Sequence, residues 1–157
     1  MKRVLVCLLL SLCILGCKAV TLPDVTLHDV NGKEVKVADL AKTGKPVIIS
    51  FFATWCKPCM RELKALNEVY ADWQEETGVE IYIVSVDKAQ DSHKVKPLVD
   101  GNGWEFHALL DPNDVFSKPM NVQHIPHMFI IDSKGKIVYN HVGYNEGDEA
   151  EIRKFLK

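Results

Sequence analysis

Two cysteines separated by two residues, Cys56 and Cys59, have the clearest chemical potential in this chain. They lie where an apolar, β-branched and aromatic run at residues 47–52 passes into residues 60–76, whose apolar residues follow helical spacing. The first turn of a helix offers unpaired N–H groups and the positive end of the helix dipole, and both favour a thiolate over a thiol. This placement predicts a redox-active pair that exchanges disulfides.

The positions of the two sulfurs predict different roles. Cys56, at the turn, is expected to be the more exposed sulfur and the nucleophile, whereas Cys59, one turn deeper, resolves the mixed disulfide. Pro58 fits the first helical turn, where its missing N–H is not needed, and Lys57 adds positive charge beside the sulfurs. The Cys56–Cys59 disulfide itself carries the electrons, so no bound cofactor is expected.

Other uses of a cysteine pair at this spacing fit less well. A structural zinc site commonly takes four ligands from two such pairs, and the sequence has no second pair. A purely structural disulfide across so small a loop stabilises little, because closure entropy grows with loop length. A Cu(I) metallochaperone stays open as an alternative, with Cys56, Cys59 and His127 as ligands and His124 nearby. The favoured interpretation needs no metal.

The other three cysteines fall within the first seventeen residues. After a basic start, residues 4–15 form an apolar run shorter than the ~20 residues that span a bilayer, which is typical of a secretory signal peptide. Residues 14–17 resemble a bacterial lipobox, in which Cys17 is lipidated and becomes the first residue of the mature chain. Residues 1–16 are therefore predicted to be a lipoprotein signal. An uncleaved N-terminal anchor, or a signal cut elsewhere, is the alternative.

Export places the remaining cysteine pair where disulfides form and persist. The expected location is extracytoplasmic, in the bacterial periplasm, with a lipid anchor in the membrane. Residues 17–23 are predicted to be a tether and residues 24–157 one domain, since about 150 residues suit a single domain. The chain has 19 basic and 21 acidic residues, which gives no basic surface for nucleic acid.

Hydrophobic patterns predict an α/β fold with the order β-β, β-α-β-α, β-β-α. A helix between two apolar strands, at residues 47–52 and 79–86, implies a right-handed parallel crossover. A short helix is expected over residues 114–120, capped by Asn113 or Asp114. The other expected elements are a hairpin around Asn31–Gly32, a helical turn at 39–43, a helix at 92–102, an extended segment at 104–110, a hairpin of 128–132 with 136–142, and a helix at 146–156.

Two separated motifs resemble the thioredoxin superfamily, and are most similar to its exported TlpA/ResA-type thiol-disulfide oxidoreductases. The first is the run at residues 51–59 with Glu62 after it, and the second is Ile125–Pro126 with the strand and hairpin that follow. The resemblance covers residues 22–157 and implies a thioredoxin-like three-layer fold: a central mixed sheet flanked by helices, with an N-terminal β-hairpin. It further implies a cis-proline at Pro126 packed on the disulfide, with the Ile125 backbone offered to an extended substrate.

Several positions depart from the family. Ser50 stands where thioredoxin carries a buried acid, so the proton of Cys59 must go elsewhere. Glu62 matches a common acid of the TlpA/ResA type, and a catalytic role and a solvated helix face both stay open for it. Trp55 is expected to line the active-site surface. A peroxidase fits less well, because Ala53 stands where peroxiredoxins need threonine.

The resemblance also implies partners. Relatives of this type act mostly as reductants, on apocytochrome c cysteines or oxidised periplasmic thiols, and a membrane electron-transfer protein reduces them again. We therefore expect protein thiol or disulfide substrates and a membrane reductase as partner. The direction of electron flow stays open, because Lys57 and the helix terminus stabilise the reduced form and make the pair more oxidising.

Overall fold

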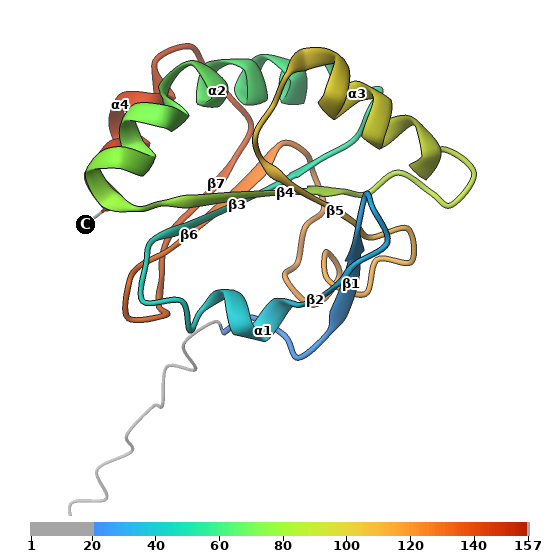
Figure 1. The fold of residues 1–157 in the computed structure, drawn as a ribbon, viewed down its shortest axis with the longest axis horizontal. Helices are drawn as coiled ribbons and strands as arrows, with labels where there is room; N and C mark the ends of the chain where they lie inside the picture. Colours follow the sequence, from blue (N-terminus) through green and yellow to red (C-terminus); the bar gives the residue numbers. More distant parts are fainter. Residues whose placement is uncertain (1–20, 157) are drawn as a thin grey trace, which may run out of the picture.

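A computed structural model describes residues 21–156, which contain a seven-stranded mixed sheet in the order β2-β1-β5-β4-β3-β6-β7 (Figure 1). The predictions for the signal at residues 1–16 and for Cys17 lie outside this part of the chain. Within residues 21–156, no helix is long and apolar enough to cross a membrane. The strands are β1 (Thr26–Asp29), β2 (Glu34–Lys36), β3 (Val47–Phe52), β4 (Glu80–Ser85), β5 (His107–Leu110), β6 (His127–Ile131) and β7 (Ile137–Val142).

The connections follow the predicted order, with one further strand, β5, in the segment at 104–110 for which a short strand or an extended loop is expected. β3 and β4 are parallel and are joined by α2 (Lys57–Thr77), while β4 and β5 are parallel and are joined by a 3-10 turn and α3 (Val95–Asn102). β6 pairs antiparallel with β3 on one side and with β7 on the other. The N-terminal hairpin of β1 and β2 joins the sheet antiparallel to β5.

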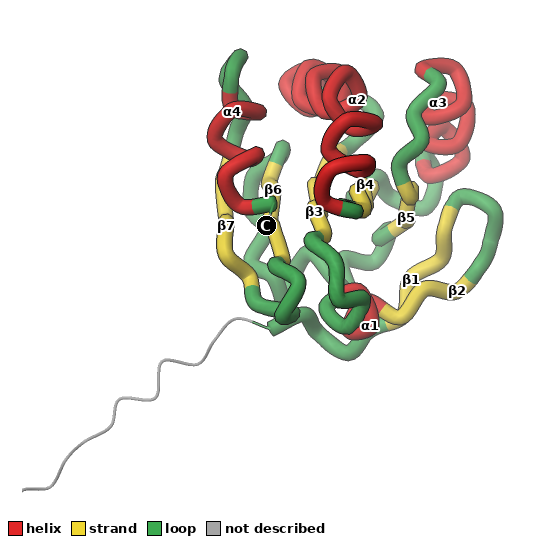
Figure 2. Tube along the Cα trace, turned by 60° about the vertical axis from the view of Figure 1, so that its left-hand side comes forward, coloured by secondary structure: helices red, strands yellow, loops and turns green. Residues whose placement is uncertain are grey.

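Helices cover both faces of the sheet (Figure 2). One face carries α2, α3 and α4 (Asp148–Ile152), which contribute to one buried cluster. The other carries α1 (Val37–Leu40) and the segment 111–126, which contribute to a second cluster. The predicted α/β, thioredoxin-like class with helices on both faces is therefore confirmed.

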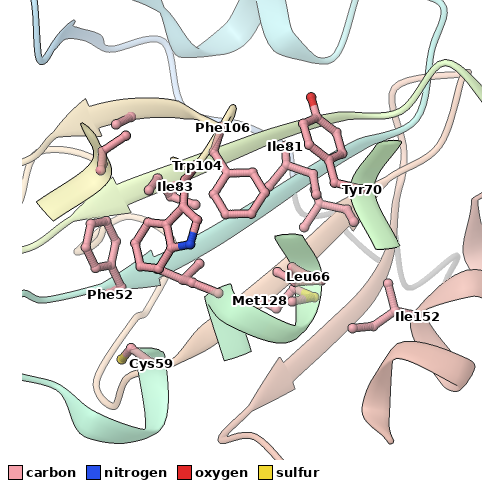
Figure 3. Close-up of a cluster of buried hydrophobic side chains, with 14 of the residues drawn as sticks. Phe52, Cys59, Leu66, Tyr70, Ile81, Ile83, Trp104, Phe106, Met128 and Ile152 are labelled. Carbon is pink, nitrogen blue, oxygen red and sulfur yellow. The ribbon is translucent and has the colours of Figure 1, made fainter. Parts of the chain in front are cut away.

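β3 is the centre of both cores because all six of its residues are buried. Ile48 and Phe52 belong to the cluster under α2, and Ile49 and Phe51 belong to the cluster on the opposite face, as the two-residue period of a strand requires. Figure 3 shows the α2-side cluster, in which Cys59 lies at the margin of aromatic and aliphatic side chains. The fully buried side chain of Cys59 is thus part of the hydrophobic core.

The helix predicted over residues 114–120 is wrong, because this segment forms turns. Asp114 has a φ of 56°, in the left-handed region that breaks a right-handed helix. The carboxylate of Asp111 takes the role expected of Asn113 or Asp114, since it accepts hydrogen bonds from the backbone N–H groups of Phe116 and Ser117. The closing helix is also shorter than predicted: α4 ends at Ile152, and a 3-10 turn over Arg153–Phe155 follows.

Candidate active site

The cysteine pair lies where the predicted strand–helix junction placed it. Cys56 and Cys59 form a disulfide between the end of β3 and the first turn of α2. The turn after β3 is closed by a hydrogen bond of 3.0 Å from the Cys56 N–H to the carbonyl oxygen of Ala53. Lys57 begins α2 and Pro58 follows it inside the first turn, as expected.

Cys56 is the N-cap residue of α2. Its Sγ accepts a hydrogen bond of 3.3 Å from the backbone N–H of Cys59. Cys56 keeps 4 % of its surface exposed and Cys59 none, so the order of exposure agrees with the prediction although the difference is small. The first turn contains no acidic residue. The helix terminus therefore presents an N–H donor and unopposed positive charge to the Cys56 sulfur.

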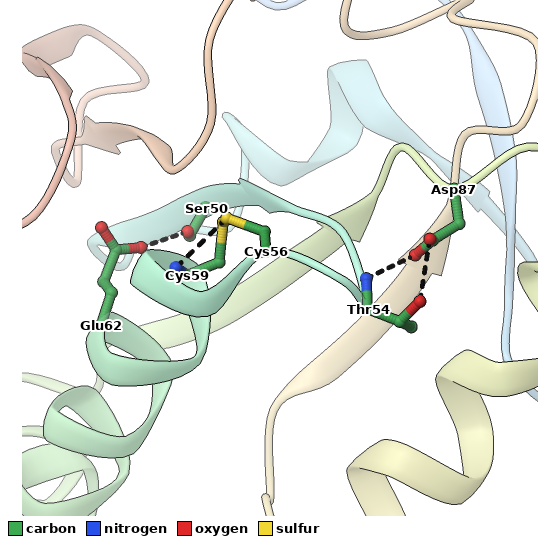
Figure 4. The surroundings of a disulfide bond; sticks show 6 residues. All are labelled: Ser50, Thr54, Cys56, Cys59, Glu62 and Asp87. Atoms are coloured by element: carbon green, nitrogen blue, oxygen red, sulfur yellow. Dashed lines mark hydrogen bonds between the residues drawn. A yellow bond between two sulfur atoms is a disulfide. The ribbon is translucent and has the colours of Figure 1, made fainter.

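Glu62 lies one turn beyond Cys59, on the buried side of α2. It is 2 % exposed, so the alternative of a solvated helix-face glutamate is wrong. The hydroxyl of Ser50, on β3, donates a hydrogen bond of 2.5 Å to Glu62 Oε1 (Figure 4). Burial raises the pKa of Glu62 to about 7; the Ser50 hydrogen bond opposes this shift, and the charges of Asp148 and Glu149 add to it. A titrating carboxyl group thus reaches Ser50, the position where thioredoxin carries its buried acid.

Asp87 is a second buried carboxyl group, on the opposite side of the disulfide from Glu62 in Figure 4. It is 2 % exposed and lies just after β4. Its carboxylate accepts hydrogen bonds from the Thr54 N–H at 2.8 Å, from the Thr54 hydroxyl at 2.9 Å and from the Ser85 hydroxyl at 2.8 Å. The sequence reasoning missed this group. One sequence feature could have revealed it: Asp87 directly follows a buried strand that is expected to be parallel to the strand leading to the cysteines. The carboxyl ends of neighbouring parallel strands meet at one edge of the sheet, so Asp87 is expected near the cysteines.

The peptide bond between Ile125 and Pro126 is cis, the isomer that the family resemblance implies. Antiparallel pairing of β6 with β3 matches His127 with Phe51, so Pro126 falls beside the end of β3. Ile125 packs against the cluster that contains both cysteines. The structure therefore brings the two separated sequence motifs together at one edge of the sheet.

An open hollow of about 260 Å³ lies next to the disulfide loop, with Trp55 and Ile125 in its wall. Trp55 is 71 % exposed, as expected of a side chain that lines the active-site surface. Val86 and Val122 contribute apolar side chains to its wall. Lys88 and Asp114 also line the hollow and form an ion pair, with 2.7 Å between Lys88 Nζ and Asp114 Oδ2.

His127 and His124 do not form a metal site with the cysteines. Among residues 21–156, no three His, Cys, Asp or Glu side chains are grouped so as to hold a metal ion. The His127 Nε2 lies 2.7 Å from the carbonyl Oδ1 of Asn140, its ring stacks on Phe129 with centroids 4.5 Å apart, and burial lowers its pKa. The described residues therefore give the Cu(I) alternative no support, and His127 is a strand residue packed into the fold.

Comparisons with known proteins agree with this geometry. The profile of the AhpC/TSA family matches residues 19–140. The chain is 33% identical over 135 residues to a protein named thiol-disulfide oxidoreductase ResA from Bacillus thuringiensis (strain Al Hakam), which covers 86% of this chain and 74% of that one. It is 32% identical over 116 residues to ResA from Bacillus subtilis (strain 168), over 74% of this chain and 62% of that one.

Solved structures give the same result. A solution structure of an uncharacterized thioredoxin-like protein from Porphyromonas gingivalis is 60% identical, with a TM-score of 0.76 over 87% of this chain and 89% of that one. A crystal structure of a putative thiol:disulfide interchange protein DsbE from Chlorobium tepidum is 27% identical, with a TM-score of 0.74 over 87% of this chain and 92% of that one. The fold, the disulfide at the start of α2 and these matches show that the chain belongs to the AhpC/TSA family of thioredoxin-like proteins, among relatives named ResA.

Proposed function

We propose that this protein is an extracytoplasmic thiol-disulfide reductase that acts on oxidised cysteine pairs of other proteins. The general activity, thiol-disulfide oxidoreductase, follows from its relatives and its fold. The direction of electron flow, the substrates and the location are the proposed part. The observation that carries the exchange chemistry is the Cys56 sulfur at the N-cap of α2, which receives the Cys59 N–H. The proposed direction rests on the resemblance to relatives that act mostly as reductants, since the helix terminus by itself makes the pair more oxidising.

This geometry assigns the nucleophile. An N–H donor and the positive end of a helix dipole stabilise a thiolate, so Cys56 in the reduced protein has a pKa below that of a free cysteine. Cys59 is buried completely and offers no surface to a protein substrate. Cys56 therefore attacks, and Cys59 resolves.

The reaction moves two electrons from the enzyme to the substrate. The Cys56 thiolate attacks one sulfur of a substrate disulfide, forms a mixed disulfide and releases the other substrate sulfur as a thiolate, which takes up a proton. Cys59 then loses its proton and attacks the Cys56 sulfur. The Cys56–Cys59 disulfide forms, and the second substrate sulfur leaves as a thiolate that is protonated by solvent.

Glu62 supplies the proton acceptor for the second step. Figure 4 shows its carboxyl group hydrogen-bonded to Ser50, on the opposite side of the disulfide from Asp87. A carboxyl group whose pKa is about 7 is present in both protonation states near neutral pH, which suits a group that accepts a proton in one step and returns it in another. Ser50 orients it through the hydrogen bond of 2.5 Å.

The substrate binds in extended form across the cis peptide. The hollow beside Trp55 and Ile125 takes the residue next to the substrate cysteine, and the backbone of Ile125 pairs with the substrate chain. Pro126 has no N–H to donate, so the backbone hydrogen bonds to the substrate at this point are assigned to Ile125.

Location and partner rest on the sequence. The signal at residues 1–16 directs export and is then removed, and the lipidated Cys17 holds the domain at the outer side of a bacterial membrane through the tether at residues 17–23. An oxidised enzyme must be reduced again before each turnover, and a membrane protein that delivers electrons as a dithiol supplies this step. We expect no bound cofactor, since the disulfide itself cycles.

Single cysteine variants test the assignment. Cys56→Ser is expected to abolish disulfide reduction, and Cys59→Ser to accumulate a mixed disulfide with substrate that mass spectrometry identifies at Cys56. Retained activity in Cys56→Ser contradicts the assigned nucleophile. Equilibration of the Cys56–Cys59 couple with glutathione tests the direction: a potential near about −270 mV supports a reductant, and one near about −120 mV contradicts it.

A further inference from the structure

We propose that Asp87 is a positioning residue for the nucleophile: its carboxylate fixes Thr54, and through Thr54 it holds the turn of residues 53–56 that presents Cys56 to the substrate. The inference rests on the proposed role of Cys56. It concerns a residue that does not touch the sulfurs through any hydrogen bond of the described structure.

The hydrogen bonds of Asp87 bind two strand ends together. Oδ2 accepts from the Thr54 N–H at 2.8 Å and from the Ser85 hydroxyl at 2.8 Å, and Oδ1 accepts from the Thr54 hydroxyl at 2.9 Å. The Asp87 N–H donates to the Ser85 hydroxyl oxygen at 3.1 Å, and the Val86 N–H donates to the carbonyl oxygen of Phe52 at 2.9 Å. The residues at the end of β4 are therefore hydrogen-bonded to one another and to the end of β3 and the loop that follows it.

The held loop contains few other restraints. Thr54 lies between Ala53, which is fully buried, and Trp55, which is 71 % exposed. Beyond Thr54, the turn is closed by the bond from the Cys56 N–H to the Ala53 carbonyl oxygen. A buried carboxylate that grips both the backbone and the side chain of one residue fixes that residue's orientation, and thereby the direction in which the chain enters α2.

Position matters here because the reactivity of Cys56 depends on geometry. The Sγ accepts the Cys59 N–H only while Cys56 is the N-cap of α2. A loop that moves lets the sulfur leave the helix terminus, and the thiolate then loses its stabilisation. Small displacements of reacting groups reduce rates by about 10²-fold.

Two substitutions at Asp87 separate the effect of its hydrogen bonds from the effect of its charge. Asp87→Ala removes all three acceptor contacts. Asp87→Asn keeps most of them: an amide oxygen in the place of Oδ2 still accepts from the Thr54 N–H and the Ser85 hydroxyl, and an amide NH₂ in the place of Oδ1 meets the Thr54 hydroxyl, which also accepts. Thr54→Val removes one contact, the hydroxyl bond, and leaves the backbone bond.

The experiment measures alkylation of Cys56 by iodoacetamide against pH in the reduced full chain, together with the rate of disulfide exchange. In Asp87→Ala the midpoint of the alkylation curve is expected to move up toward the ~8.5 of a free cysteine, and the exchange rate to fall about tenfold or more. Asp87→Asn is expected to lose clearly less than Asp87→Ala in both measurements, and Thr54→Val to fall between Asp87→Ala and the parent.

Asp111→Ala is the matched control. Asp111 is another fully buried aspartate that holds backbone N–H groups, those of Phe116 and Ser117, in a different loop. Its loss destabilises the fold in a similar way but is expected to leave the alkylation midpoint of Cys56 unchanged. A general loss of stability would move both variants equally, and that result contradicts the proposal.

The remaining outcomes also decide. A parent-like alkylation midpoint in Asp87→Ala overturns the positioning role. An equal loss of exchange rate and an equal midpoint shift in Asp87→Asn and Asp87→Ala also overturn it, because they assign the effect to the charge of Asp87 and not to its hydrogen bonds. If Asp87→Ala does not fold, Thr54→Val decides, because a parent-like midpoint there overturns the proposal. Failure of the proposed function is distinct: it appears in the parent, as preferential alkylation of Cys59 over Cys56.

Discussion

The disulfide of this protein lies between two buried carboxyl groups whose surroundings differ. Glu62 and Asp87 are each 2 % exposed. Within the described residues, Glu62 receives one side-chain hydrogen bond, from Ser50, whereas Asp87 accepts three, from Thr54 and Ser85. Burial penalises the charged form of an acid and donors favour it. Glu62 is thus left with a raised pKa, and Asp87 is held in place by its three hydrogen bonds.

This contrast relates to function because the two groups touch different parts of the site. Ser50 and Glu62 connect β3 to α2 on the side of Cys59, where a proton must move. Thr54 and Asp87 connect the loop before Cys56 to β4, where a backbone must stay in place. A poorly solvated carboxyl group with few donors, such as Glu62, suits proton transfer. A carboxyl group with all its hydrogen bonds made, such as Asp87, suits holding a backbone in place.

The largest effect expected from the difference between Glu62 and Asp87 is on the free energy of unfolding at pH 8. Asp87→Ala leaves the half-buried Thr54 donors and the buried Ser85 hydroxyl without their acceptor, so stability is expected to fall by about 3 kcal/mol. Glu62→Gln replaces a carboxylate that is ionised and desolvated at this pH by a neutral amide, so stability is expected to rise by about 2 kcal/mol. Urea denaturation measures both changes, and a loss of equal size in the two variants contradicts the contrast.

A related test uses pH. The folded-state pKa of Glu62, about 7, lies above its ordinary value of 4.5, so the folded protein binds more protons than the unfolded chain between these values. Stability therefore falls as pH rises from 4.5 through 7, by about 3 kcal/mol from this group. The difference in unfolding free energy between the parent and Glu62→Gln should grow across this window and be constant above pH 8. A difference that does not vary with pH contradicts the shifted pKa.

The kinetic counterpart concerns the resolving step. Glu62→Gln removes the proposed proton acceptor, so resolution of the mixed disulfide is expected to slow by about 100-fold, while alkylation of Cys56 stays near the parent rate. Acid quenching of the reaction followed by mass spectrometry measures the mixed disulfide. An increase in this species in Glu62→Gln, with loss of the inflection near pH 7 from the rate profile, is the expected result. An unchanged profile assigns the proton to water.

The smallest effect is expected from Ser50→Ala. The Ser50 hydrogen bond lowers the pKa of Glu62, so its removal moves the inflection of the rate profile to higher pH, by about 0.7 unit for a hydrogen bond worth about 1 kcal/mol. Ser50→Thr keeps the hydroxyl and serves as control. An inflection that moves to lower pH in Ser50→Ala contradicts the donor role of Ser50.

The sequence predicts the parts of the site that depend on local pattern. The all-buried strand β3, the start of α2 at the cysteines and the two hairpins have strong local signals: apolar runs, helical spacing and Asn-Gly or Gly turns. Whether Glu62 is catalytic or lies on a solvated helix face could not be decided without the tertiary structure. Helical spacing alone does not tell which side chains of α2 are covered by α4 and β3. The structure places it against Ser50.

Two kinds of contact explain what the sequence did not reveal. Local contacts replace the helix predicted at residues 114–120 by turns: Asp111 accepts from the N–H groups of Phe116 and Ser117, and Asp114 has a left-handed backbone. The other kind is long-range. Asp87 contacts Thr54 across 33 positions of sequence. Such partners are chosen by how parallel strands align, and neither residue type nor spacing states this alignment.

The exposure of Trp55 has a practical consequence. The chain has three tryptophans, all within the described residues; Trp73 and Trp104 are buried, and Trp55 is exposed next to the disulfide. A neighbouring disulfide quenches the fluorescence of an indole ring, and solvent shifts the emission of an exposed indole to longer wavelength. The protein therefore carries an optical reporter of its own oxidation state, and electron transfer through Cys56 and Cys59 can be followed in real time without any label.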